Sequence, residues 1–120
     1  MAGSAERRPA ASRKKGRWVV TGTVRARESG RPLQGLAVRA FDQDMRSDDY
    51  LGRDTTDASG RYEIGFKAAA FRKLFESRPD LYVLVYDAAG RELASTKGSV
   101  RKNAGTVEEI DVEIPESLLS

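Results

Sequence analysis

The chain has 120 residues, of which 39% are apolar and 32% are charged. This length suits one domain, and the composition excludes a coiled coil, a collagen and a wholly disordered chain. Cysteine and histidine are both absent. Their absence excludes disulfides, thiolate nucleophiles, Cys-bound metal clusters and every catalytic arrangement that depends on an imidazole.

The net charge of +3 is concentrated at the N-terminus. Residues 1–17 hold six of the 21 basic residues and one of the 18 acidic residues, which leaves 15 basic and 17 acidic residues in the remainder. Because this segment has no apolar periodicity, we predict a disordered basic tail over residues 1–17. The remainder is mildly acidic, which argues against a sequence-specific nucleic-acid binder. No long apolar run is present, so we expect no transmembrane segment, and a protein that is cytoplasmic or exported without a recognisable signal peptide.

Alternating side chains predict short strands separated by turns. The first strand follows the tail, where Trp18, Val20 and Val24 share one face. The pattern Asp-x-x-Gly at residues 57–60 and 87–90 predicts type I turns closed by a left-handed glycine. The seven predicted strands lie near residues 18–25, 36–42, 53–56, 61–66, 81–86, 91–96 and 109–114.

One segment has a helical period instead. Phe71, Leu74 and Phe75 lie at positions i, i+3 and i+4, which predicts a short helix over residues 68–76. Together with Tyr82 and Tyr86, these phenylalanines form either a satellite core that seats the helix or a ligand pocket between helix and sheet. We favour the satellite core.

These elements predict an all-β domain over residues 18–115, followed by a C-terminal tail over residues 116–120. The fold class that we expect is a seven-stranded antiparallel Greek-key β-sandwich, with the short helix before the fifth strand. No disulfide is possible, so packing between the two sheets must stabilise the domain.

Two sequence segments resemble those of a known family. Val20-Thr21-Gly22-Thr23-Val24, followed by the run Gly30-Arg31-Pro32-Leu33-Gln34-Gly35-Leu36, resembles the opening of carboxypeptidase regulatory-like domains, which belong to the transthyretin-like (prealbumin-like) β-sandwiches. Thr55-Thr56-Asp57-Ala58-Ser59-Gly60-Arg61-Tyr62 resembles their second signature. The resemblance implies a non-catalytic spacer or binding module, of the kind found in large bacterial, partly toxin-complex-like polypeptides.

Enzymes of related fold do not suit this chain. The hydroxyisourate hydrolases that resemble transthyretin depend on histidines and on a C-terminal Tyr-Arg-Gly-Ser signature, and both are missing here. Intradiol dioxygenases hold iron with two tyrosines and two histidines, and this chain supplies only the tyrosines. We therefore expect no enzymatic activity and no cofactor other than calcium.

An acidic loop is the candidate metal site. Carboxylate oxygens are ligands that Ca²⁺ prefers, and an Asp-x-Asp at a strand end directs two of them toward one pole. A solvated acidic turn, with local pairing to Arg46 or Arg53, is the alternative. The candidate calcium ligands, within residues 42–54, are Asp42, Asp44, Asp48 and Asp49.

The basic tail is a candidate for partner binding through charge, with a solubilising linker as the alternative. The residues concerned are Arg13, Lys14, Lys15 and Arg17. The same charges could attract the acidic loop of a neighbouring copy. We hypothesise a non-catalytic module that docks onto other proteins, and a calcium-binding β-sandwich is the alternative.

Overall fold

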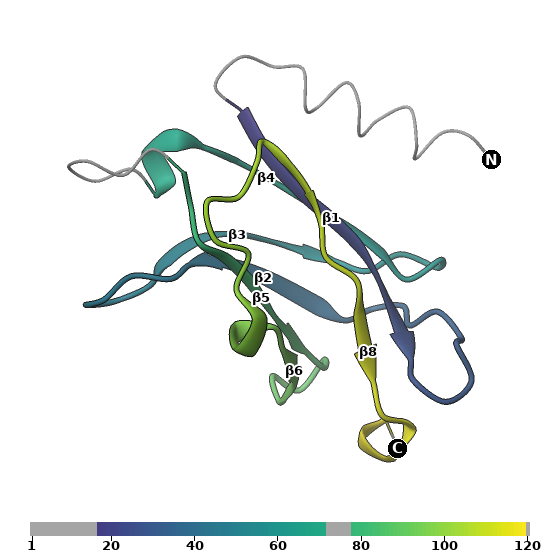
Figure 1. Ribbon diagram of the computed structural model, residues 1–120. Helices are drawn as coiled ribbons and strands as arrows, with labels where there is room; N and C mark the ends of the chain where they lie inside the picture. The colour runs from purple at the N-terminus through teal and green to yellow at the C-terminus, as the bar shows by residue number, and fades with distance from the viewer. Residues whose placement is uncertain (1–16, 72–77, 120) are drawn as a thin grey trace.

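The computed structural model describes residues 17–71 and 78–119, and its longest strand is β1 (Arg17–Ala26). This strand organises a four-stranded sheet, and a second four-stranded sheet packs against it to form a sandwich (Figure 1). The β-sandwich architecture is therefore confirmed. The described residues contain eight strands rather than the seven predicted. They include no helix long and apolar enough to cross a membrane.

The first sheet is mixed, which corrects the prediction of a purely antiparallel fold. On one edge β1 pairs antiparallel with β4 (Arg61–Lys67), in register from Arg17 with Lys67 to Thr23 with Arg61. On its other edge β1 pairs with β7 (Val107–Glu109) and then β8 (Val112–Ile114), both parallel to it. The alternation of side chains shows which face of a strand is buried. It is the same whether the neighbouring strand is parallel or antiparallel, so it does not predict the direction of pairing.

A break in the backbone pairing at Ile110 and Asp111 divides the predicted last strand into β7 and β8. The Ile110 amide still donates to Thr21 O at 2.8 Å, whereas the Thr23 amide donates to the Asp111 carboxylate at 2.9 Å in place of a backbone carbonyl. The register is the same on both sides of the break, Thr21 with Glu109 and Val24 with Val112, so no residue is inserted and the missing backbone bond accounts for the eighth strand.

The second sheet has the strand order β3-β2-β5-β6 and is antiparallel throughout. The strand predicted near residues 53–56 belongs to this sheet and begins earlier than expected, because Asp49 already pairs with Asp42. The loop before it is therefore only residues 43–48. The four strands are β2 (Ala37–Asp42), β3 (Asp49–Thr55), β5 (Leu81–Tyr86) and β6 (Glu92–Ser95).

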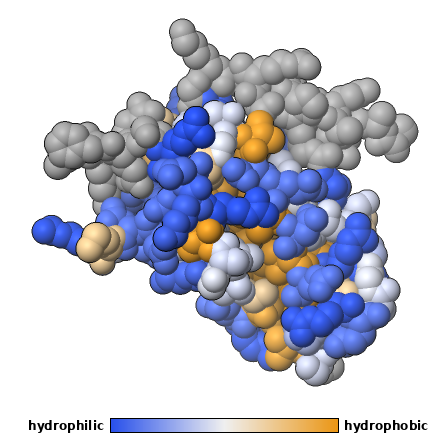
Figure 2. Space-filling model, viewed as in Figure 1, coloured by the Kyte–Doolittle hydropathy of each residue, from blue (hydrophilic) through white to orange (hydrophobic). Residues whose placement is uncertain are grey.

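The core lies between the inward faces of the two sheets. Val20 and Ile64 from the first sheet and Val38, Val83 and Val85 from the second are at most 2% exposed. Each such side chain contributes about 1.5–3 kcal/mol by leaving water. Figure 2 shows that hydrophobic residues also form a band between β6 and β8, where the edges of the two sheets come together.

The predicted helix over residues 68–76 is a single 3₁₀ turn, Ala68–Ala70, in its described part; residues 72–77 lie outside the described residues. This turn directs Phe71 into the main core, where its ring meets that of Trp18 edge-on at 5.2 Å. The satellite cluster is therefore wrong in this respect, because Phe71 belongs to the core between the sheets while Tyr82 lies against Phe41. Leu74 and Phe75 fall outside the described residues.

The two Asp-x-x-Gly turns form as predicted. Gly60 and Gly90 have φ angles of +75° and +88°, and the carboxylate of the first aspartate in each turn accepts two backbone amides. Gly60 also needs its lack of a Cβ, since that atom would lie 2.5 Å from Val24 O. Beyond β8, part of the predicted C-terminal tail forms a 3₁₀ turn, Glu116–Leu118, which an Arg31–Glu116 ion pair at 3.1 Å ties to the domain.

Candidate interaction surface

The outer face of the second sheet, opposite the core, carries aromatic rings from three adjacent strands. Phe41 of β2 stacks on Tyr82 of β5 with ring centroids 5.3 Å apart, and Tyr50 of β3 packs against Phe41 at 5.7 Å. Tyr82 is 4% exposed, whereas Tyr50 is 52% exposed. The row therefore runs from a buried ring to one that is open to solvent.

A polar network covers the buried end of this row. The Tyr82 hydroxyl donates a short hydrogen bond to Asp48, and the Lys97 ammonium lies 3.3 Å from the same carboxylate and 5.5 Å from the centre of the Tyr82 ring. The Asp48 carboxylate also accepts the Asp44 amide at 2.9 Å. The hydrogen bond from Tyr82 is the main reason why the pKa of Asp48 is lowered. Burial, reinforced by Asp48, raises the pKa of Tyr82.

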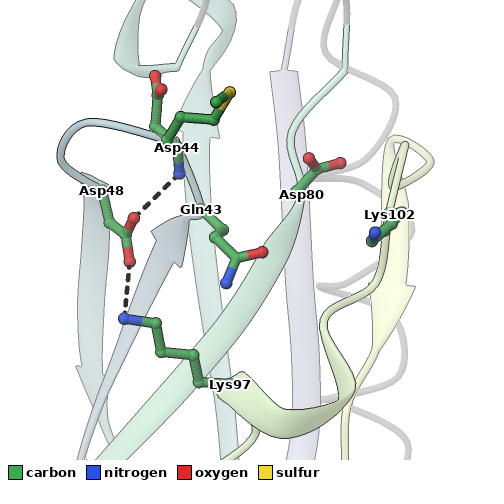
Figure 3. Close-up of a pocket in the computed structure, with 7 residues that line it drawn as sticks. Gln43, Asp44, Asp48, Asp80, Lys97 and Lys102 are labelled. Carbon is green, nitrogen blue, oxygen red and sulfur yellow. Dashed lines mark hydrogen bonds and ion pairs between the residues drawn. The ribbon is translucent and has the colours of Figure 1, made fainter.

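A cleft of about 430 Å³ opens beside this network, at the end of the second sheet. Asp48 and Lys97 line one side, and Asp80 and Lys102 lie across from them (Figure 3). The cleft thus presents both signs of charge. The carboxylates of Asp44, Asp48 and Asp80 lie apart rather than turning toward one point (Figure 3).

The structure places two of the predicted calcium ligands, Asp42 and Asp49, opposite each other on paired strands, and the other two, Asp44 and Asp48, in the loop between those strands. Asp42 is fully buried in β2 and accepts the Asp80 amide at 2.7 Å. Asp44 lines the cleft and accepts the Arg46 amide at 3.4 Å, while Asp49 lies in β3. Asp48 is engaged with Tyr82 and Lys97.

No group of three or more carboxylates in residues 17–71 and 78–119 converges in a way that could hold a metal ion. The two carboxylates of the Asp-x-Asp pair differ in burial, because Asp42 points inward from β2 and Asp44 lies in the loop beyond it. The calcium site stays a prediction of the sequence, without support from the arrangement of the described residues.

A second row on the outer face consists of two arginines that the sequence analysis missed as a pair. Arg39 of β2 and Arg53 of β3 lie directly opposite each other in the register of the two strands, and both are exposed. The Arg39 guanidinium lies over the ring of Tyr86 of β5, 4.8 Å from its centre. The alternation of the second strand places Arg39 on the same face as Phe41, but the partner strand and its register cannot be read from a local pattern.

Most of the predicted partner-binding tail lies outside the described residues. Arg13, Lys14 and Lys15 fall outside the described residues. Arg17 is the first residue of β1, and its guanidinium lies so close to Gly65 that a Cβ there would come within 2.5 Å of Nη2. Arg17 therefore belongs to the folded sheet.

Comparisons with known proteins point to the fold alone. No family model matches the sequence, and a search of curated proteins found no significant match. Among solved structures, a 9R-lipoxygenase from Cyanothece PCC8801 matches 82% of this chain at 21% identity with a TM-score of 0.56, and the chain spans only 16% of that protein.

Two further solved structures are dioxygenases. The dioxygenase domain of a dioxygenase–carbohydrate-binding protein fusion from Streptomyces sp. SirexAA-E matches 82% of this chain and 79% of its own length, at 16% identity and a TM-score of 0.52. A 3-chlorocatechol 1,2-dioxygenase from Rhodococcus opacus 1CP has a TM-score of 0.42 at 16% identity, with 82% of this chain and 60% of the enzyme covered. At these identities the likeness concerns the β-sandwich and not the activity.

Proposed function

We propose that this chain is a non-catalytic protein-interaction module that binds its partner through the outer face of the second sheet. The observation that carries the proposal is that this face presents Tyr50, Arg39 and Arg53 to solvent from two paired strands. Tyrosine and arginine are the residue types that dominate binding energy at protein interfaces. A rigid sheet holds them in a fixed pattern, which lowers the entropy cost of binding.

The ionisable groups beside this face also support a role in binding rather than in catalysis. A general acid or base works best with a pKa near the operating pH. In the Asp48–Tyr82 pair, the pKa of the carboxyl group is lowered and that of the phenol is raised, so both move away from neutrality. The Asp48 carboxylate and the Tyr82 hydroxyl are therefore suited to a structural hydrogen bond.

The same proposal places the chain among carboxypeptidase regulatory-like, or transthyretin-like, domains with Greek-key connectivity. The resemblance of residues 20–24 and 55–62 to that family supports this assignment. In this role the chain needs no cofactor. It acts as an accessory part of a larger bacterial assembly, in which contact with another protein is the function.

Site-specific photo-crosslinking tests this proposal. A photoreactive residue in place of Tyr50, which is 52% exposed, is compared with one in place of Val107, which lies on the first sheet and is 54% exposed. We expect one defined protein to be captured from position 50 in producing cells, and the purified pair to bind saturably. Equal capture from both positions, capture from neither, or turnover of a substrate by the purified chain would contradict the proposal.

A further inference from the structure

The two arginines on the outer face stand in an arrangement that the fold alone does not favour. Arg39 and Arg53 are directly opposite each other on neighbouring antiparallel strands. Like charges in this position destabilise a sheet. Arginine remains charged at any physiological pH, so neither side chain can relieve the repulsion by losing its proton.

No ion pair between these arginines and a carboxylate is found among the described residues. The nearest acid along β3, Asp54, is used elsewhere, because its oxygens accept the Thr55 and Glu63 amides at 2.8 Å. Only four of the described basic residues have an ion pair, each at 3.3 Å or less: Arg31, Arg91, Lys97 and Arg101. Among residues 17–71 and 78–119, Arg39 and Arg53 take part in no ion pair of this kind.

One of the two arginines also contacts an aromatic ring. The Arg39 guanidinium lies over the Tyr86 ring, 4.8 Å from its centre, a contact that favours a fixed position and uses the face of the guanidinium rather than its N–H donors. Tyr50 and Phe41 lie in the adjacent row on the same two strands. We call Arg39, Phe41, Tyr50, Arg53 and Tyr86 the arginine–aromatic face.

We infer that the arginine–aromatic face binds a carboxylate-rich segment of a protein partner. This inference rests on the proposed function and names the chemistry of the partner. The paired guanidinium groups bind carboxylates, which arginine can do with two parallel hydrogen bonds, and Tyr50 and Phe41 contact the apolar stems of the same segment. The partner thus supplies the carboxylates that these two arginines lack as ion-pair partners among the described residues.

A nucleic acid fits this face less well than an acidic peptide. Outside residues 1–17 the chain holds 17 acidic and 15 basic residues, so a long polyanion meets net repulsion beyond the pair itself. Bases also need open ring faces on which to stack, whereas Phe41 and Tyr82 occupy each other's faces with an interplanar angle of 15°.

The test measures binding of a fluorescent ten-residue glutamate peptide to the full chain, with single-stranded DNA of equal charge as a comparison probe. The double variant Arg39→Gln with Arg53→Gln should bind the peptide at least about tenfold more weakly. The control, Arg25→Gln with Arg27→Gln, removes the same charge from exposed positions at the end of β1 and should change binding less than about twofold.

A second measurement makes the result independent of general charge effects. Because the two arginines repel each other, Arg53→Gln alone should raise the melting temperature of the free chain while it weakens peptide binding. A purely structural role for Arg53 would lower the melting temperature instead. Equal loss of binding in both double variants, tighter binding of DNA than of peptide, or no binding of the peptide would overturn the inference.

The failure of this inference is distinguishable from failure of the proposed function. If a protein is captured from position 50 and its binding is lost with Tyr50→Ala but not with the arginine variants, the module stands and its partner is not acidic. If nothing is captured from position 50, the proposed function itself is wrong.

Discussion

Two regions of the sandwich use a tyrosine and its neighbours in opposite ways. At the break between β7 and β8, the Tyr62 hydroxyl donates to Ile110 O at 2.7 Å, the same carbonyl lies against Gly22, and all three residues are buried. On the outer face of the second sheet, Tyr50 is half exposed beside two unmatched arginines. The first arrangement stabilises the packing of the first sheet. In the second, repulsion between the two arginines lowers the stability of the chain, but the surface stays open to a partner.

The largest effect is expected from filling the space over Gly22, at the break between β7 and β8. A Cβ on Gly22 would lie 1.9 Å from Ile110 O and 2.8 Å from the Tyr62 ring. Because the clash is with backbone, Gly22→Ala should lower the free energy of unfolding by about 3 kcal/mol or more. Gly98→Ala is the control, since nothing lies within 4 Å of its added Cβ, and should change the urea midpoint little. Similar midpoints for the two variants would refute this description of the packing at Gly22.

Removing only the hydroxyl group has a smaller effect. Tyr62→Phe leaves the buried Ile110 carbonyl without this donor and should cost about 1–3 kcal/mol in chemical denaturation. Tyr50→Phe removes a hydroxyl that makes no hydrogen bond with the described residues, and should alter stability by less than about 0.5 kcal/mol. A larger loss from Tyr50→Phe than from Tyr62→Phe would reverse the roles assigned to the two regions.

The two buried tyrosines also predict an alkaline limit. Burial raises the pKa of both Tyr62 and Tyr82. The folded chain thus keeps these protons when the unfolded chain loses them above about pH 10, the ordinary value for tyrosine. Stability should be constant below that pH and then fall by up to about 1.4 kcal/mol per pH unit for each tyrosine. Urea midpoints between pH 8 and pH 11 measure this, and an unchanged slope in Tyr62→Phe would argue against it.

An acid limit follows from Asp48. Its pKa is lowered, chiefly by the Tyr82 hydroxyl, so its contribution to stability is present above the ordinary aspartate pKa and is lost as the pH falls below about 4. Asp48→Asn should cost about 1 kcal/mol at pH 7 and flatten the acid limb of the stability curve. Thermal melts of both proteins from pH 7 to pH 3 make the comparison. Parallel curves would show that Asp48 carries no such contribution.

The smallest expected effect is that of calcium. Asp48 already contacts Lys97 at 3.3 Å and Tyr82, so a cation would have to displace both. We expect the melting temperature to stay the same in millimolar Ca²⁺. Saturation at a hundred times Kd would instead stabilise the chain by about 2.7 kcal/mol. A rise of that size, abolished by Asp42→Asn with Asp44→Asn, would establish the calcium site that the sequence predicts.

Local patterns in the sequence predict the strands and the sandwich but not the pairing of distant segments. The alternation along residues 61–66 and the Asp-x-x-Gly turns are local features, and the structure confirms both. The parallel pairing of β7 and β8 with β1 depends on contacts almost 90 residues apart, which no periodicity records. The split of the last strand follows from the carbonyl of Ile110 lying over Gly22, which the sequence shows only as one more glycine.

The candidate interaction surface could not be predicted from the sequence either, because it too depends on the pairing of distant segments. The dense aspartates of residues 42–49 suggest a metal site because they are neighbours in the chain, yet the fold pairs Asp42 with Asp49 across two strands and leaves Asp44 and Asp48 in the loop between them. Arg39 and Arg53 lie 14 positions apart and meet only because β2 and β3 pair in one particular register. A single shift of that register would separate them.

The most direct test of the account is to map where an acidic segment binds. Backbone amide shifts of the isotope-labelled chain are recorded while a ten-residue glutamate peptide is titrated in. The account predicts that saturable shifts centre on Arg39, Phe41, Tyr50, Arg53 and Tyr86, with Gly22 and its neighbours in the first sheet unaffected. Shifts centred instead on Lys97 and Lys102 in the cleft, or on the outer face of the first sheet, would contradict it.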